Sequence, residues 1–311
     1  MMARPVTIGT RGSKLALWQA EWARSALLAR FPGMSVELAV IKTQGDKILD
    51  VPLAQVGGKG LFVKEIEEAL RDGRVDIAVH SMKDMPADIL EGLAVGAVPE
   101  REISADVLIS RGGERLAELA TGSVIGTSSL RRGAQLRHAR PDLRIEPLRG
   151  NLDTRLRKLE TGGLSAVVLA AAGVRRLGLE DRITEILGPD LMLPAVGQGA
   201  LCIEIRANDP RIGPLVAGLN HPDTHAAVAG ERSFLRRLGG SCQVPIAGYG
   251  RVEGRRFDLT GLVAAVDGSA LIRHHLSGPV QDAAALGVEL AEVLLARGAD
   301  IILQKLTSTA R

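Results

Sequence analysis

Along the first two thirds of the chain, short apolar runs alternate with segments in which apolar residues recur every three or four positions. Short apolar runs bounded by turn residues predict strands, and apolar residues three or four positions apart predict helices. We expect helices at 13–31 and 62–73 and strands at 6–10, 36–43, 76–81, 93–98, 106–110, 123–127, 144–148, 166–170 and 201–205. Ser13 suits the N-cap of the first helix and Gly73 the end of the second. Strands and helices that alternate at this spacing predict parallel sheets in an α/β architecture.

The pattern changes beyond residue 220. One helix is expected at 224–238 and another at 280–297, and between them lie predicted strands near 245–251, 256–265 and 270–276, with a VDGS turn at 266–269. Strands linked by hairpins and flanked by helices predict a small α+β domain. A chain of 311 residues has room for two or three such domains.

Composition narrows the class of protein. Hydrophobic residues make up 46% of the chain and charged residues 24%, which is ordinary for a globular protein. The central apolar run AVVLAAAGV is about half as long as a membrane span, and the N-terminus lacks the apolar region of a signal peptide, so we expect a cytoplasmic protein without a membrane partner. The two cysteines, Cys202 and Cys242, have no CxxC partner and no histidine at ligand spacing. We therefore expect neither a disulfide scaffold nor a metal site.

The strongest charge signal is the segment 128–158. It holds eight arginines and a lysine against three acids, a net charge of +6 in a chain whose total is +3. Clustered arginine first suggests nucleic acid, but the segment has no aromatic residue for base stacking and no helix-turn-helix or zinc-finger spacing. Any one of these arginines could simply be solvated. As a group, Arg131, Arg132, Arg149 and Arg155 fall where strands or loops turn into helices, which favours binding the carboxylates or phosphates of a small ligand.

A second polar cluster follows the predicted strand at 76–81. The segment AVHSMKDMP places His80, Ser81, Lys83 and Asp84 near the carboxyl end of that strand, where ligands bind in open α/β sheets. Asp84 could simply form an Asx turn ahead of proline. Among arginines, however, its carboxylate could accept hydrogen bonds from N–H groups that become cationic during a reaction.

Two loops complete the candidate chemistry. GGKGLF at 57–62 lacks the phosphate-loop pattern, and its glycines predict a flexible lid that carries Lys59 and Phe62. LGGSCQVP at 238–245 places Cys242 outside any apolar run, as expected for an exposed, nucleophilic thiol. Cys202, in ALCIEI, has instead the setting of a small buried hydrophobic residue.

Eight segments taken together resemble one known family. In the family's own order between residues 11 and 245, they are RGSKLALWQA, KTQGD, GKGLFVKEIEEAL, AVHSMKDMP, SSLRRGAQL, RGNLDTRL, LPAVGQGA and GGSCQVP. The chain is similar in these segments to the porphobilinogen deaminases, also called hydroxymethylbilane synthases. Two positions depart from the family pattern, which commonly has glycine where this chain has Ser241 and often has glycine where it has Cys202.

The resemblance implies a transferase of tetrapyrrole (porphyrin, haem) biosynthesis. Such an enzyme joins four porphobilinogen molecules head to tail with loss of ammonia and releases hydroxymethylbilane. It implies a monomer whose dipyrromethane cofactor is held by a thioether to Cys242, with Asp84 as the catalytic residue. The other matching positions are cofactor-binding Lys83, Ser129, Arg131 and Arg132, and substrate-binding Arg11, Ser13, Arg149, Arg155 and Arg176.

The resemblance also implies a fold: two periplasmic-binding-protein-like α/β domains plus a small α+β C-terminal domain. The expected boundaries are 1–99 plus 200–217, 105–193 and 222–311, and the two crossings near 99–104 and 194–199 could act as a hinge. Two alternatives remain. A non-enzymatic two-lobed anion-binding protein would explain the arginines but give Asp84 and Cys242 no task, and an RNA-binding protein would explain only the charge.

Overall fold

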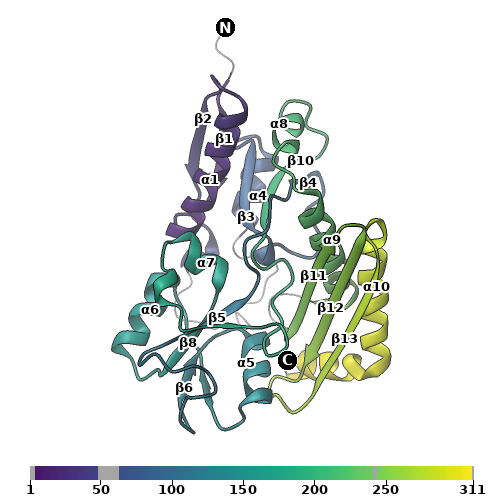
Figure 1. The fold of residues 1–311 in the computed structure, drawn as a ribbon. Helices are drawn as coiled ribbons and strands as arrows, with labels where there is room; N and C mark the ends of the chain where they lie inside the picture. Colours follow the sequence, from purple (N-terminus) through teal and green to yellow (C-terminus); the bar gives the residue numbers. More distant parts are fainter. Residues whose placement is uncertain (1–3, 48–62, 241–243, 310–311) are drawn as a thin grey trace.

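The strands of the protein form three sheets in the computed structural model, which describes residues 4–47, 63–240 and 244–309. In Figure 1 the first sheet lies at the top, the second below it and the third at the right. The first and second sheets are each accompanied by helices, and the third is a hairpin-linked sheet beside two long helices. The expected fold class, two α/β parts and a small α+β part, is confirmed. Within the described ranges, no helix is both long and apolar enough to cross a membrane.

The first sheet has the strand order β2-β1-β3-β10-β4. Its strands are β1 (Val6–Thr10), β2 (Val36–Val40), β3 (Ile77–Ser81), β4 (Leu93–Ala97) and β10 (Leu201–Arg206). The helices of this part are α1 (Lys14–Arg30), α2 (Gln44–Lys47), α4 (Lys64–Arg71) and α8 (Gly213–Ala217). Strand β1 pairs in parallel with β2 and β3, but β10 runs antiparallel to β3 and β4.

The second sheet has the strand order β7-β6-β8-β5-β9. Its strands are β5 (Asp106–Ser110), β6 (Val124–Gly126), β7 (Arg144–Glu146), β8 (Ala166–Ala170) and β9 (Glu185–Leu187). The helices here are α5 (Leu130–Ala139), α6 (Leu152–Thr161), α7 (Ala171–Arg176) and the 3-10 turn η2 (Glu180–Arg182). Strand β5 is antiparallel to β8 and β9.

The prediction of parallel sheets is therefore wrong for β5 and β10, because both larger sheets are mixed. Each of these strands enters its sheet directly from a crossing between the two sheets instead of through a covering helix. A strand buried on both faces reads as a continuous apolar run whichever way it is paired. Apolar pattern alone consequently does not reveal the direction of these strands.

The third sheet is a meander of long strands, β11-β12-β13. Its elements are α9 (Pro222–Arg237), β11 (Ile246–Glu253), β12 (Arg256–Ala264), β13 (Leu271–Pro279), η3 (Val280–Asp282), α10 (Ala283–Leu294), η4 (Leu295–Ala299) and α11 (Asp300–Thr309). Helices α9 and α10 cross closely because Gly287 lies against the carbonyl oxygen of Gly230, where no side chain would fit. The helix predicted at 280–297 begins as the 3-10 turn η3 and continues as α10 and η4, and Gly298, with φ 97°, then turns the chain into α11.

The chain crosses between the first two sheets twice, after β4 and before β10, as the family resemblance implied for residues 99–104 and 194–199. Glu231, on α9, has a buried carboxylate that accepts hydrogen bonds from both crossings. The donors are the Arg101 side chain of the first crossing and the Gly197 backbone N–H of the second. The predicted domains contain these three sheets in the same order, and their boundaries stay a prediction.

Candidate functional site

Asp84 lies at the junction of the first two sheets. It ends the 3-10 turn η1 (Met82–Asp84), which directly follows β3, and it is exposed while Met82 fills the core beneath it. Lys83 is half-buried and its Nζ donates to Oε1 of Gln198 at 3.3 Å. Burial lowers the pKa of Lys83 to about 8, and nearby Arg132 lowers it as well, whereas Asp84 opposes the shift. The turn thus places a cation and an exposed carboxylate side by side.

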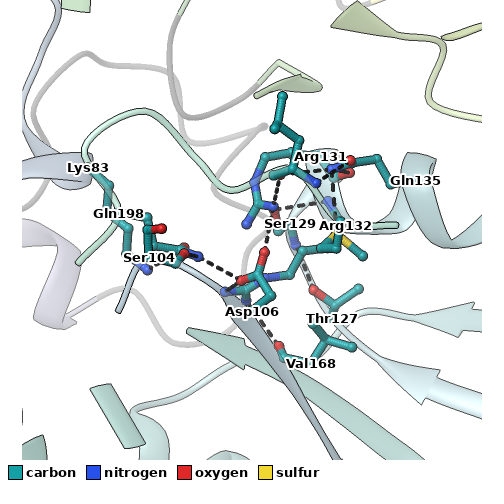
Figure 2. Close-up of polar contacts among 12 residues, drawn as sticks. Lys83, Ser104, Asp106, Thr127, Ser129, Arg131, Arg132, Gln135, Val168 and Gln198 are labelled. Atoms are coloured by element: carbon teal, nitrogen blue, oxygen red, sulfur yellow. Dashed lines mark hydrogen bonds and ion pairs between the residues drawn. The ribbon is translucent and has the colours of Figure 1, made fainter. Parts of the chain in front are cut away.

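Arg131 and Arg132 begin α5, whose N-cap is Ser129; the Ser129 hydroxyl accepts from the Arg132 backbone N–H at 3.4 Å. Both arginines are only 5% exposed. Figure 2 shows their guanidinium groups converging on Asp106, with Arg131 Nη1 2.7 Å from Oδ2 and Arg132 Nη2 2.7 Å from Oδ1. The interpretation of a single arginine here as a solvated side chain is therefore wrong for both.

Asp106, at the start of β5, is a functional candidate that sequence analysis missed. It is fully buried, and Arg131, Arg132 and Gln198 hold the pKa of its carboxyl far below the usual range against the effect of burial. The only local signal is an acid directly before the apolar residues VLI. Its partners lie 25 or more positions away, so no spacing rule would have found them.

Arg149 and Arg155 approach the same junction from the second sheet. They flank the turn into α6, where Gly150 has φ 111° and the Asn151 side chain caps the helix by accepting from the Thr154 N–H at 2.9 Å. Arg155 Nε donates to the Gly150 carbonyl at 2.8 Å. Burial lowers the pKa of Arg155 to about 10, Arg132 and Arg149 add to this, and Asp84 opposes it. Arg155, on α6 beside the second sheet, and Asp84, in the turn after β3 of the first sheet, therefore interact through charge.

Arg176 of α7 and Ser13, the N-cap of α1, come from two helices that contact each other. The Arg176 guanidinium lies 5.6 Å from the centroid of the Trp18 ring, and its Nη2 donates to the Gly199 carbonyl at 2.7 Å. Burial lowers the pKa of Arg176 to about 10. Ser13 caps α1 by accepting from the Ala16 N–H at 3.3 Å, and Arg11 is half-buried just after β1.

Five of these side chains form what we call the cation array: Lys83, Arg131, Arg132, Arg149 and Arg155. Asp84 and Asp106 both act on Lys83 through charge, and Asp84 also acts on Arg155. The five cations of the array outnumber these two acids. Such a site can bind a ligand with several carboxylates, because guanidinium groups match carboxylates in shape and charge.

Three predicted site residues, Cys242, Lys59 and Phe62, lie outside the described residues, as does Ser241. Cys202 is fully buried in β10, and burial together with Glu204 raises the pKa of its thiol. It is the inert structural residue that its apolar context predicted. The described ranges contain no group of His, Cys, Asp and Glu side chains that could hold a metal ion.

His80 does not lie where its place after the predicted strand suggested, and Arg137 and Arg140 of the basic segment contact other parts of the protein. His80 points into the first sheet, with Nε2 3.1 Å from Oε2 of buried Glu204, so it does not line the crevice. Arg137 donates to the carbonyl of Val266, in the turn between β12 and β13, at 3.1 Å. Arg140 pairs with Asp142 at 2.6 Å. The two arginines therefore hold the structure together and are not freely solvated.

Comparison with known proteins gives a consistent result. Residues 6–213 match the family model described as "Porphobilinogen deaminase, dipyromethane cofactor binding domain", and residues 225–296 match "Porphobilinogen deaminase, C-terminal domain". The porphobilinogen deaminase of Pelobacter propionicus is 55% identical over 98% of both chains, and that of Geobacter metallireducens is 56% identical over 97% of this chain and 95% of the relative. Among solved structures, the periplasmic aliphatic sulphonate binding protein SsuA of Escherichia coli matches 75% of this chain and 70% of its own, with 15% identity and a TM-score of 0.40, too low to carry an argument.

Proposed function

We propose that this chain, which belongs to the porphobilinogen deaminase family, joins four porphobilinogen molecules head to tail and releases hydroxymethylbilane, the linear precursor of porphyrins and haem. The observation that carries the proposal is the 55% identity to a porphobilinogen deaminase over 98% of the chain. The enzyme is a transferase that forms a carbon–carbon bond and expels ammonia at each addition. A non-enzymatic anion-binding role is not favoured, because it leaves the exposed carboxylate of Asp84 without a task.

The charge of the site fits the dipyrromethane cofactor of this family. Two linked pyrrole rings, each with an acetate and a propionate, carry four carboxylates, and the cation array supplies five cations in reach of one junction. We propose that Lys83, Ser129, Arg131 and Arg132 hold the cofactor and that Cys242 binds it covalently. When bound, the cofactor supplies a tethered ring from which the product chain grows.

We assign the substrate's own carboxylates to the outer residues of the site. Arg149 and Arg155 are the two members of the cation array that come from the turn into α6, and Arg11, Ser13 and Arg176 lie toward α1 and α7. Lys59 and Phe62 would cover the site as parts of a lid. These assignments rest on the family resemblance and on charge.

Asp84 is proposed to stabilise the cation that forms when ammonia leaves. Departure of ammonia from the aminomethyl carbon leaves positive charge that is shared with the pyrrole nitrogen of the substrate. An exposed carboxylate can accept the N–H of that ring and stabilise its charge, and it can accept the proton that is lost when the rings have joined. Asp84 interacts through charge with Lys83, assigned to the cofactor, and with Arg155, assigned to the substrate, so its carboxylate would lie close to both rings.

The test replaces Asp84 with asparagine, which keeps the shape and removes the charge. We expect D84N to retain the cofactor in its intact mass and to lose about 10²–10³-fold in kcat, the usual effect of removing one transition-state stabiliser. D88N is the matched control, because Asp88 is an exposed acid nearby that pairs with Arg236 at 2.8 Å. Bilane synthesis by D84N above a tenth of the D88N rate would contradict the role of Asp84.

The covalent assignment has its own test. Cys242→Ser should reduce the intact mass of the denatured protein by one dipyrromethane, while Cys202→Ser should leave that added mass in place. An added mass that persists in Cys242→Ser would refute this attachment site.

A further inference from the structure

The buried carboxylate of Asp106 is the common partner of the arginines at the start of α5. Its Oδ1 accepts from Arg132 Nε at 2.9 Å and from Arg132 Nη2 at 2.7 Å, and its Oδ2 accepts from Arg131 Nη1 at 2.7 Å. Each arginine also donates to a backbone carbonyl, Arg131 to Leu193 at 2.8 Å and Arg132 to Val168 at 3.0 Å. With two or more bonds to each guanidinium, both orientations are fixed before any ligand arrives.

Gln198 connects this pair to the first sheet. Its side-chain Nε2 donates to Asp106 Oδ1 at 2.9 Å and to the Ser104 carbonyl at 2.7 Å, while its Oε1 accepts from Lys83 Nζ at 3.3 Å. Figure 2 shows Gln198 lying between Lys83 on one side and Asp106 on the other. Gln198 is fully buried and belongs to the second crossing of the chain. One amide side chain therefore spans both crossings and joins cations from two sheets.

The cluster holds more cations than fully buried acids. Arg131 and Arg132 pair with one fully buried carboxylate, that of Asp106, which also acts on Lys83 through charge. Burial, Arg132 and Arg131 all lower the pKa of Lys83, and the two groups that raise it are Asp84 and Asp106. Asp106 thus helps to keep Lys83 protonated near neutral pH, where its charge is needed for an anionic ligand.

We propose that Asp106 and Gln198 are positioning residues that assemble Lys83, Arg131 and Arg132 into one rigid anion-binding unit across the two crossings. The proposal rests on the proposed function, since the unit is the part of the cation array assigned to the cofactor. Asp106 supplies one carboxylate from the protein itself, which permits three cations to lie close together while the site is empty. Three cations held together in this way suit a ligand with several carboxylates.

The test measures Lys83 directly, without relying on turnover. Lys83 is labelled with an amine-reactive reagent across a pH series in the full-length chain, and its half-labelling pH is read by peptide mass spectrometry. We expect D106N to lower that pH by roughly 0.5–1 unit, less than the 1–3 units of a directly paired acid. The cofactor mass should also fall to a smaller fraction of the molecules. Gln198→Met keeps the volume of the side chain, removes its hydrogen bonds and leaves the arginine pairs with Asp106 intact. It should also lower the half-labelling pH of Lys83 and the fraction of molecules that carry the cofactor.

The control is D142N. Asp142 also pairs with an arginine, Arg140, at 2.6 Å, but in the loop between α5 and β7 and with both side chains partly exposed. The D142N substitution should change neither the labelling of Lys83 nor the cofactor mass. An unchanged half-labelling pH in folded D106N or in folded Gln198→Met would overturn the proposal, and so would an equal shift in D142N. If D106N does not fold, Gln198→Met alone decides. Failure of the proposed function would look different: the unmodified chain would make no bilane, whatever the labelling of Lys83.

Discussion

Replacing Glu231 with glutamine is expected to loosen the joint at which the third sheet meets both crossings. The Glu231 carboxylate is fully buried on α9. It accepts from Arg101 Nη1 at 2.5 Å and Nη2 at 3.2 Å, from the Gly197 N–H at 2.6 Å and from the Gly250 N–H at 2.7 Å. One carboxylate thus joins the first crossing, the second crossing and β11.

The expected size of the effect follows from burial. The Arg101 side chain is only 11% exposed, so without its partner a nearly buried guanidinium would lose its counter-charge. Breaking a buried pair from one side costs about 3–5 kcal/mol, and the amide of glutamine also turns a donor toward groups that are donors themselves. Glutamine keeps one accepting oxygen, which places E231Q at the lower end, about 3 kcal/mol. With an unfolding entropy of about 2.1 cal/mol/K per residue, that corresponds to a fall in Tm of roughly 5 °C for a chain of 311 residues.

The assay is thermal and urea unfolding followed by circular dichroism. The matched control is E292Q, because Glu292 pairs with Arg237 at 2.5 Å with the two side chains 52% and 45% exposed. An exposed pair of this kind contributes at most about 1 kcal/mol, so E292Q should unfold almost as the parent chain does. If E231Q and E292Q unfolded within about 2 °C of each other, the reasoning from burial would be refuted.

Two further changes test other parts of the structure. Burial and Glu204 raise the pKa of Glu67 from its ordinary 4.5 to about 7, so its favourable contribution to stability is fully present below about pH 4.5 and is lost as the pH rises through about 7. E67Q, which mimics the protonated acid, should therefore gain Tm relative to the parent chain between pH 5.5 and pH 8.5; a difference that stays constant with pH would contradict this. Gly199→Ala should lose more Tm than Gly113→Ala, because both glycines have φ near +90° but only at Gly199 would a Cβ collide with the Glu102 carbonyl oxygen; equal losses would mean that backbone strain alone matters.

Local patterns predicted most of the secondary structure. The strands at 6–10, 106–110 and 166–170 match to the residue, because each is a compact apolar run between turn residues. Strand β9 was not predicted, since it has three residues and one of them, Ile186, is 55% exposed. Its place in the sheet is decided by pairing with β5, which no local pattern contains.

The candidate site could be predicted only as far as motifs reach. Arg131 and Arg132 were expected at a helix start and lie there, but their burial depends on Asp106, which precedes them by about 25 positions in the chain. Charge clustering also could not separate Arg155, which faces the junction, from Arg140, which pairs with a local aspartate. Sequence shows where cations are dense, whereas long-range acids determine which of them remain available for a ligand.

The strength of each polar contact between the sheets bears on how the site could widen as the product chain grows. Arg131, Arg132 and Glu231 take part in buried ion pairs around the crossings, and breaking such pairs would leave charge uncompensated at large cost. At the other end of the junction, Lys14 of α1 pairs with Asp153 of α6 at 2.7 Å, with side chains 73% and 40% exposed. Water can replace that contact at a cost of about 1 kcal/mol or less. A hinge at the two crossings stays a prediction; on these contacts we expect it to open at Lys14 and Asp153 and to turn where Gln198 keeps Lys83 and Asp106 together.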